Sequence, residues 1–219
     1  MSSSDAHAGH HNPNLAHHFD TIEKQDHAVR LGMWLFLGTE VLLFAGLFLG
    51  YTVYRHFYHD AFHHASRSLD IRLGLTNTLV LITSSLTVAL AYYAVKVGRR
   101  RMALLMLAIT IAFACAFLMI KYVEYAHKFH VGSLPGKWFS DPSLAKFPGA
   151  NLYFTVYFLT TGLHAFHVIV GMSVLIWVSK GVIKGRYTPE YYVPVELGAL
   201  YWHLVDLVWI FLFPLLYLI

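Results

Sequence analysis

After a polar start, the chain alternates long apolar segments with short polar ones. Each apolar segment is close to the roughly 20 residues that an α-helix needs to cross a bilayer. The pattern predicts an all-α fold, an integral membrane bundle of five transmembrane helices that fills residues 31–219. The five helices are expected at about 31–54, 73–95, 102–126, 152–179 and 195–219.

Residues 1–30 have a different character, because they are polar and hold six of the fifteen histidines. They contain no basic segment followed by a short apolar stretch and a small-residue cleavage site, so no signal peptide is expected. We interpret them as a polar, histidine-rich cytoplasmic tail.

The composition supports a membrane protein and removes several other classes. Hydrophobic residues make up 57% of the chain and charged residues only 13%, against about 25% charged residues in soluble domains. The single cysteine, Cys115, excludes an internal disulfide, a CxxCH haem attachment and, on this chain alone, a two-cysteine copper centre or a cysteine-ligated iron–sulfur cluster. The basic residues cluster in loops, which indicates membrane topology and not nucleic-acid binding.

The basic residues also predict an orientation. With the N-terminus in the cytoplasm, nine lysines and arginines would lie inside and seven outside, and the inner loops "KVGRRR" and "KGVIKGR" are short and dense. Short loops weigh most in the positive-inside rule, so we expect the N-terminus inside and the C-terminus outside. The seven outer residues in this count are Arg55, Arg67, Arg72, Lys121, Lys128, Lys137 and Lys146.

Ionisable side chains inside the predicted helices are the candidate functional residues, since burying them in a membrane is costly. A rise of about 1.5 Å per residue places Glu40, His167, His203 and Asp206 roughly 12–18 Å deep, in one layer. The remaining polar candidates are His164, Glu196 and, at the outer ends of their helices, Glu124 and Asn77.

Two interpretations of these residues stay open. His164 and His167 are spaced i, i+3, as are His203 and Asp206, so each pair shares a helix face and Asp206 is expected to accept a hydrogen bond from His203. Such groups commonly form a hydrogen-bond network that holds helices together. The alternative is haem or metal ligation, for which His167 and His203 are the candidate pair.

Glu40 is unusual because it has no polar neighbour within a turn except Thr39. A role in protonation or lipid contact and a purely structural role are both open for it. We therefore treat Glu40 as a candidate proton-uptake residue or buried structural carboxyl.

Several motifs, in their order along the chain, resemble subunit III of the haem–copper terminal oxidases, in particular the five-helix bacterial form of cytochrome c oxidase subunit 3. The resemblance covers about residues 31–219. It is carried by "TEVLLFAGLFLGYTVY" (39–54), "LTNTLVLITSS" (75–85), "KYVEY" (121–125), "TGLHAFHVIVGM" (161–172) and "ELGALYWHLVDLVWIFLFPLLY" (196–217).

The resemblance implies an accessory subunit of a proton-pumping oxidase in the bacterial inner membrane. It implies no catalytic residue, cofactor or metal on this chain, with haem and copper held by partner subunits I and II. The family packs on the catalytic subunit, supports proton uptake and protects against inactivation during turnover. Glu40 matches its buried carboxylate, and the match implies a helix-binding polar network of His164, His167, His203 and Asp206.

The resemblance also leaves alternatives. The chain is expected to lack the first two helices of the seven-helix form. The lipid-binding cleft of the family would therefore lack one wall on this chain. Phospholipid binding is kept as an open alternative. Subunit III of a quinol oxidase, a membrane cytochrome that uses His167 and His203, and a proton channel that uses Glu40 and Asp206 are competing functions. The electron donor, the haem types of the partner and contacts with other respiratory complexes are undetermined.

Overall fold

The computed structural model describes residue 17 and residues 19–218, so most of the predicted 1–30 tail lies outside the described residues. Five of the described helices are long and apolar enough to cross a membrane, which confirms the predicted fold class. These helices are α1 (Ile22–Phe57), α3 (Ile71–Lys96), α4 (Arg100–Val131), α5 (Ala150–Ile183) and α6 (Val193–Tyr217). The short α2 (His59–Ser66) and the 3-10 helix η1 (Gly136–Trp138) lie in the connections between them.

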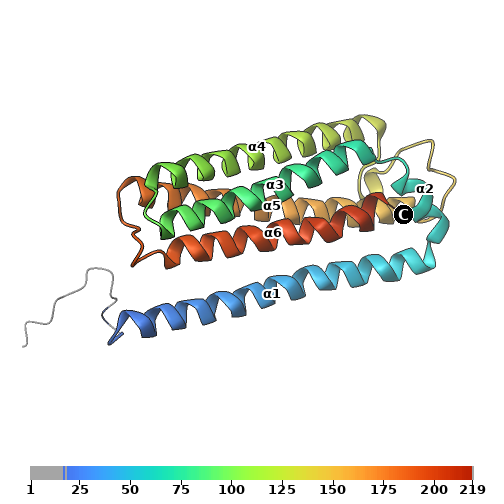
Figure 1. Ribbon diagram of the computed structural model, residues 1–219. Helices are drawn as coiled ribbons and strands as arrows, with labels where there is room; N and C mark the ends of the chain where they lie inside the picture. Colours follow the sequence, from blue (N-terminus) through green and yellow to red (C-terminus); the bar gives the residue numbers. More distant parts are fainter. Residues whose placement is uncertain (1–16, 18, 219) are drawn as a thin grey trace, which may run out of the picture.

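Four of the long helices form a bundle, and α1 lies along one side of it (Figure 1). In the bundle, α3 packs against α4 and α6, and α5 packs against the same two helices from the other side. α1 contacts α5, α6 and α2. Only 11% of the most apolar stretch of α1 is buried, against 56% for α6. Most of the α1 surface therefore faces away from the rest of the chain.

Four of the five long helices are longer than their apolar segments predict, because caps and turns determine where they end. α1 begins at residue 22 instead of 31, where the Thr21 side chain accepts a hydrogen bond from the Lys24 N–H. Asp70 caps α3 in the same way. α4 continues to Val131 and ends at Gly132, whose φ of 84° is readily adopted only by glycine. With 36 residues, α1 is about 54 Å long, more than the hydrocarbon core of a bilayer.

Two fully buried tryptophans of α6 occupy the centre of the bundle. Trp202 Nε1 donates to Ser84 Oγ at 3.0 Å, and Trp209 Nε1 donates to Thr78 Oγ1 at 3.1 Å. Gly171 of α5 makes room for this packing, since a Cβ there would lie 2.9 Å from the Trp202 ring. Shape and hydrogen bonds together fix α6 against α3 and α5.

At the C-terminal end of α1 the chain turns into α2, and the 132–149 connection between α4 and α5 lies at the same end of the molecule (Figure 1). Phe62 of α2 is buried between Tyr51 and Tyr153, with ring centroids 5.4 and 5.3 Å away. In the connection, Asp141 accepts hydrogen bonds from Ser133 and Ser143. Burial pushes the pKa of the Asp141 carboxyl upward, but these hydrogen bonds outweigh it and hold the pKa below its ordinary value.

Candidate functional site

Glu40 and His167 form a direct contact between α1 and α5. Glu40 Oε2 lies 2.8 Å from His167 Nε2, and His167 Nδ1 lies 2.8 Å from the Leu163 carbonyl oxygen. A carbonyl can only accept, so Nδ1 carries a hydrogen and donates it. The bond between Nε2 and Oε2 therefore holds one further proton, whether the imidazole or the carboxyl bears it.

Aromatic rings shield this pair from its surroundings. The Phe44 ring meets the His167 ring edge-on, with centroids 5.2 Å apart, and Tyr201 Oη donates to the His167 carbonyl oxygen at 3.4 Å. The side chains of His167 and Glu40 are 8% and 16% exposed. Within one turn of Glu40 along the sequence, the only polar residue is Thr39. In the fold its partner is His167 of α5, 127 residues later.

The second polar contact between α1 and the bundle lies near the start of α1, about seven turns before the helix ends at Phe57. Arg30 Nη2 donates to Glu196 Oε2 of α6 at 2.9 Å. Both side chains are partly exposed, 39% and 23%, so this ion pair contributes less than a buried one would. Together the two polar contacts join the middle of α1 to α5 and the start of α1 to the start of α6.

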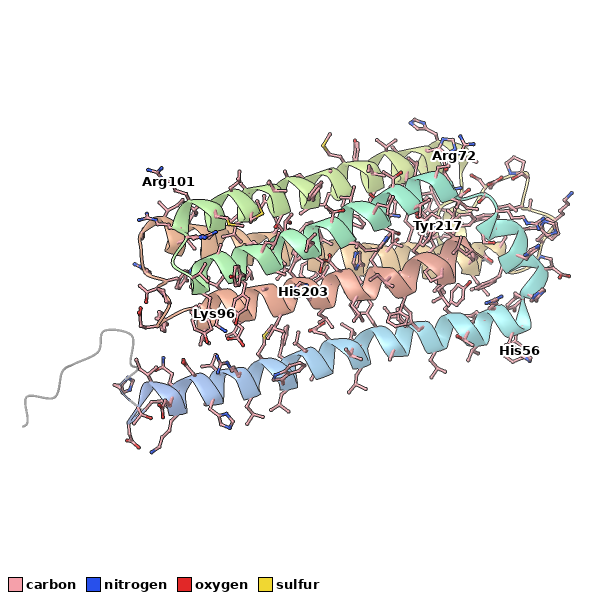
Figure 2. All side chains as sticks on the ribbon, viewed as in Figure 1. His56, Arg72, Lys96, Arg101, His203 and Tyr217 are labelled. Atoms are coloured by element: carbon pink, nitrogen blue, oxygen red, sulfur yellow. The ribbon has the colours of Figure 1, made fainter. Side chains whose placement is uncertain are left out.

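His203 and Asp206 do not pair as the sequence predicted. His203 Nδ1 lies 2.6 Å from Ser85 Oγ of α3, and Figure 2 shows His203 near the middle of α6. Neither oxygen of Asp206 has a hydrogen-bond partner among the described residues. Ser85 Oγ lies near the Asp206 carboxyl but outside hydrogen-bonding geometry, and its close contact is with His203.

The proposed bis-histidine pair also loses its geometric basis. Both ring nitrogens of His167 are engaged, one by Glu40 and the other by a carbonyl of its own helix. His203 is held against α3 by Ser85. Among the residues that the structure describes, no group of three or more His, Cys, Asp or Glu side chains is placed to hold a metal ion.

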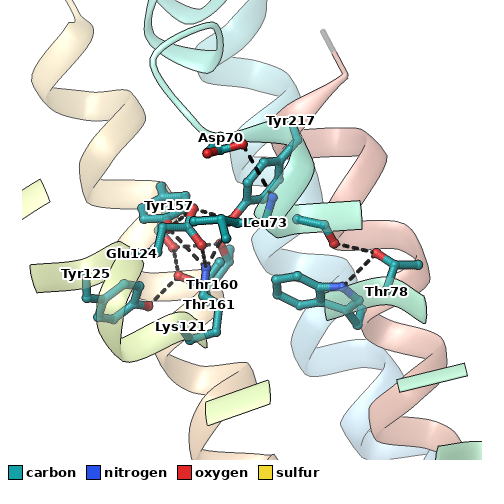
Figure 3. Close-up of polar contacts among 12 residues, drawn as sticks. Asp70, Leu73, Thr78, Lys121, Glu124, Tyr125, Tyr157, Thr160, Thr161 and Tyr217 are labelled. Atoms are coloured by element: carbon teal, nitrogen blue, oxygen red, sulfur yellow. Dashed lines mark hydrogen bonds and ion pairs between the residues drawn. The ribbon is translucent and has the colours of Figure 1, made fainter. Parts of the chain in front are cut away.

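A buried network, of which the sequence analysis predicted only Glu124, lies toward the C-terminal end of α4 (Figure 3). The Lys121 ammonium donates to Glu124 Oε2 at 3.0 Å, to Tyr157 Oη at 3.0 Å and to Tyr217 Oη at 3.1 Å. The two tyrosine hydroxyls in turn donate to Glu124 Oε1, at 3.0 and 2.5 Å. All three ammonium hydrogens and both carboxyl oxygens are therefore satisfied within α4, α5 and α6.

Aromatic rings complete the surroundings of the Lys121 ammonium. Its Nζ lies 5.0 to 5.7 Å from the ring centroids of Tyr157, Trp209, Tyr125 and Tyr217. The positive-inside count had placed Lys121 in an outer loop. Its i, i+3 spacing from Glu124 was the signal available in the sequence, because it places both charges on one helix face.

The other two candidates lie in the bundle without such partners. The His164 ring is 5.5 Å from Phe117 and 5.2 Å from Trp209, and no nitrogen of His164 is hydrogen-bonded to a described residue. Asn77 is fully buried, and its amide has no hydrogen-bond partner in the described part of the chain either. Glu124 is engaged by the lysine–tyrosine network and does not bond to Asn77.

Apolar grooves flank α1 on both sides. One, of about 810 Å³, runs between α1 and α6 and is lined by Trp34, Leu42 and Leu207, with His203 on its wall. The other, of about 440 Å³, lies between α1, α5 and α6 and includes Trp177 and Tyr201. These grooves make α1 the most open part of the fold.

Five apolar helices with buried polar contacts between some of them define the class, an integral membrane helix bundle. A sequence model of the family "Cytochrome c oxidase subunit III" matches residues 11–219. The chain is 30% identical over 218 residues to cytochrome c oxidase subunit 3 of Gallus gallus and 31% identical over 218 residues to that of Dugong dugon. Each alignment covers 92% of this chain and 72% of the relative. The chain belongs to the cytochrome c oxidase subunit III family and is a subunit III of a terminal oxidase.

Proposed function

We propose that this subunit is an accessory, non-redox part of a haem–copper cytochrome c oxidase that reduces oxygen to water. In this proposal subunits I and II hold the haem and copper, and this chain packs on the catalytic subunit among membrane phospholipids. Its work is to support proton uptake and to protect the enzyme from inactivation during turnover.

The Glu40–His167 contact is the observation that carries the proposal. It is the polar contact that joins the middle of α1 to α5, where most of the surrounding α1 surface is apolar and exposed. A helix held in this way can keep a fixed position while its outer face meets lipid or a neighbouring subunit. The same contact places a carboxyl group of α1 within the membrane span.

The orientation that we propose has the N-terminus in the cytoplasm of a bacterium and the C-terminus outside its inner membrane. Lys96 and Arg101 lie at one end of the bundle, and Arg72 and His56 lie at the other (Figure 2). Lys121 and Lys128 are buried within α4 and belong to no loop. Removing them from the outer side of the count leaves five basic residues outside against nine inside, which supports this orientation.

The test replaces Glu40 in the whole oxidase complex. We expect Glu40→Ala to shorten the active lifetime during turnover and to slow proton uptake, because α1 loses its hydrogen bond to α5. Thr39→Ala is the matched control, since the Thr39 hydroxyl is exposed and bonds only to the Phe36 carbonyl of its own helix. Unchanged turnover, pumping and lifetime in Glu40→Ala would refute the assigned role of this carboxyl.

A further inference from the structure

Three buried polar side chains of the four-helix bundle have no protein partner. Asn77 of α3 and His164 of α5 are 0% exposed, and Asp206 of α6 is 3% exposed. None of their six side-chain nitrogen and oxygen atoms forms a hydrogen bond with a described residue. In native structures such groups are nearly always bonded, to protein or to ordered water.

His164 and Asp206 lie beside Trp209, and Asn77 lies at the same level of the bundle on α3. The His164 ring centroid is 5.2 Å from that of Trp209. Asp206 precedes Trp209 by three residues and so shares its face of α6. Trp209 Nε1 bonds to Thr78 Oγ1, and Thr78 follows Asn77 directly in α3. Three helices therefore bring their unpaired polar groups to the same level.

The polar neighbours of this layer are already engaged. Thr78 accepts the hydrogen bond of Trp209, and the Ser85 hydroxyl beside Asp206 contacts His203. Within a membrane, bulk water cannot satisfy such groups, so their partners must lie inside the protein. Phe117, the other ring that packs against His164, offers no conventional hydrogen bond.

We propose that Asn77, His164 and Asp206 line an internal hydration site, in which ordered water molecules bridge α3, α5 and α6. Water suits this set because each molecule both donates and accepts, as an amide, an imidazole and a carboxyl together require. A metal cation suits it less, since the Lys121 ammonium lies 5.3 Å from the Trp209 ring and would repel a second positive charge. The site is independent of the proposed role of Glu40.

The test is a cryo-electron microscopy structure of the intact oxidase complex, at a resolution where buried water molecules elsewhere in the complex are visible. We expect at least one water peak within hydrogen-bonding distance of two of the three side chains. Asn77→Leu should remove or displace that peak. Asp206→Asn should keep it, because the amide still offers a donor and an acceptor.

Thr160→Val is the matched control, since Thr160 is buried on α5 and its hydroxyl bonds only to carbonyls of its own helix. The water peak should persist in this variant. Well-resolved side chains without a water peak, or side chains that bond directly to one another, would overturn the proposal. The wild-type complex alone gives this answer if the leucine variant fails to assemble.

Discussion

Neutralising Glu124 should destabilise this subunit strongly, because it leaves the buried Lys121 ammonium without its counter-charge. The two side chains are 3% and 4% exposed, and the carboxylate accepts one hydrogen bond from the lysine and two from tyrosines. Removing one partner of a buried ion pair typically costs about 3–5 kcal/mol. For a chain of this size, that corresponds to a fall of roughly 6–20 °C in the unfolding midpoint.

A double variant separates the charge from the packing. Glu124→Gln keeps the shape and an acceptor oxygen, and Lys121→Met keeps an unbranched apolar chain. We expect each single variant to unfold at a clearly lower temperature. The double variant should recover at least half of the larger single loss, because no unpaired charge remains.

The assay is stepwise heating of the detergent-purified complex, followed by quantification of the subunit that stays soluble. Glu23→Gln in the exposed first turn of α1 is the control and should shift the midpoint little. A Glu124→Gln midpoint that matches this control, or a double variant as unstable as the two single losses added together, would contradict the reasoning.

Three further perturbations test other parts of the structure. His167→Phe keeps an aromatic ring but removes the hydrogen bond to Glu40. It should lower the unfolding midpoint by only a few degrees, since such bonds contribute about 0.6 kcal/mol in membranes. A loss as large as that of Glu124→Gln would contradict this. Gly171→Leu should prevent stable assembly, because even its Cβ would lie 2.9 Å from Trp202, and normal yield on size-exclusion chromatography would refute the close approach. The Asp141 carboxyl has a lowered pKa in the folded state, so its contribution is complete above the ordinary value of about 3.9 and is lost as the pH falls through the lowered pKa. Midpoints measured against pH should therefore fall on acidification below about pH 4 less steeply in Asp141→Asn than in the wild type, and identical slopes would refute that role.

Hydropathy alone was sufficient to predict the five spans, since long apolar segments have few other stable arrangements in a membrane. It was a poor guide to their ends. α1 begins nine residues before the predicted position and α4 continues five residues beyond it. Both extensions contain polar residues outside the apolar segments. The α1 extension begins after the Thr21 cap, and the α4 extension ends before Gly132, which has a left-handed backbone conformation.

The polar contacts were only partly predictable, because they depend on helix rotation and neighbours. Glu40 and His167 were placed at one depth, and they do meet. His203 and Asp206 were paired by spacing alone, but His203 contacts Ser85 of α3 instead. Lys121 was counted with an outer loop, although it lies within the helix predicted at 102–126. No pattern within one segment reveals the two tyrosines that engage it from α5 and α6.

The central claim is that this chain is a subunit of an oxidase whose redox groups are held by other subunits. The most direct test is to purify the complex gently from its native membrane and to measure haem spectra and metal content, before and after this chain is separated from its partners. The account predicts haem and copper in the intact complex and none that remain with the separated chain. Stoichiometric haem or metal on the separated chain would contradict it, and its intramembrane histidines would then be ligands.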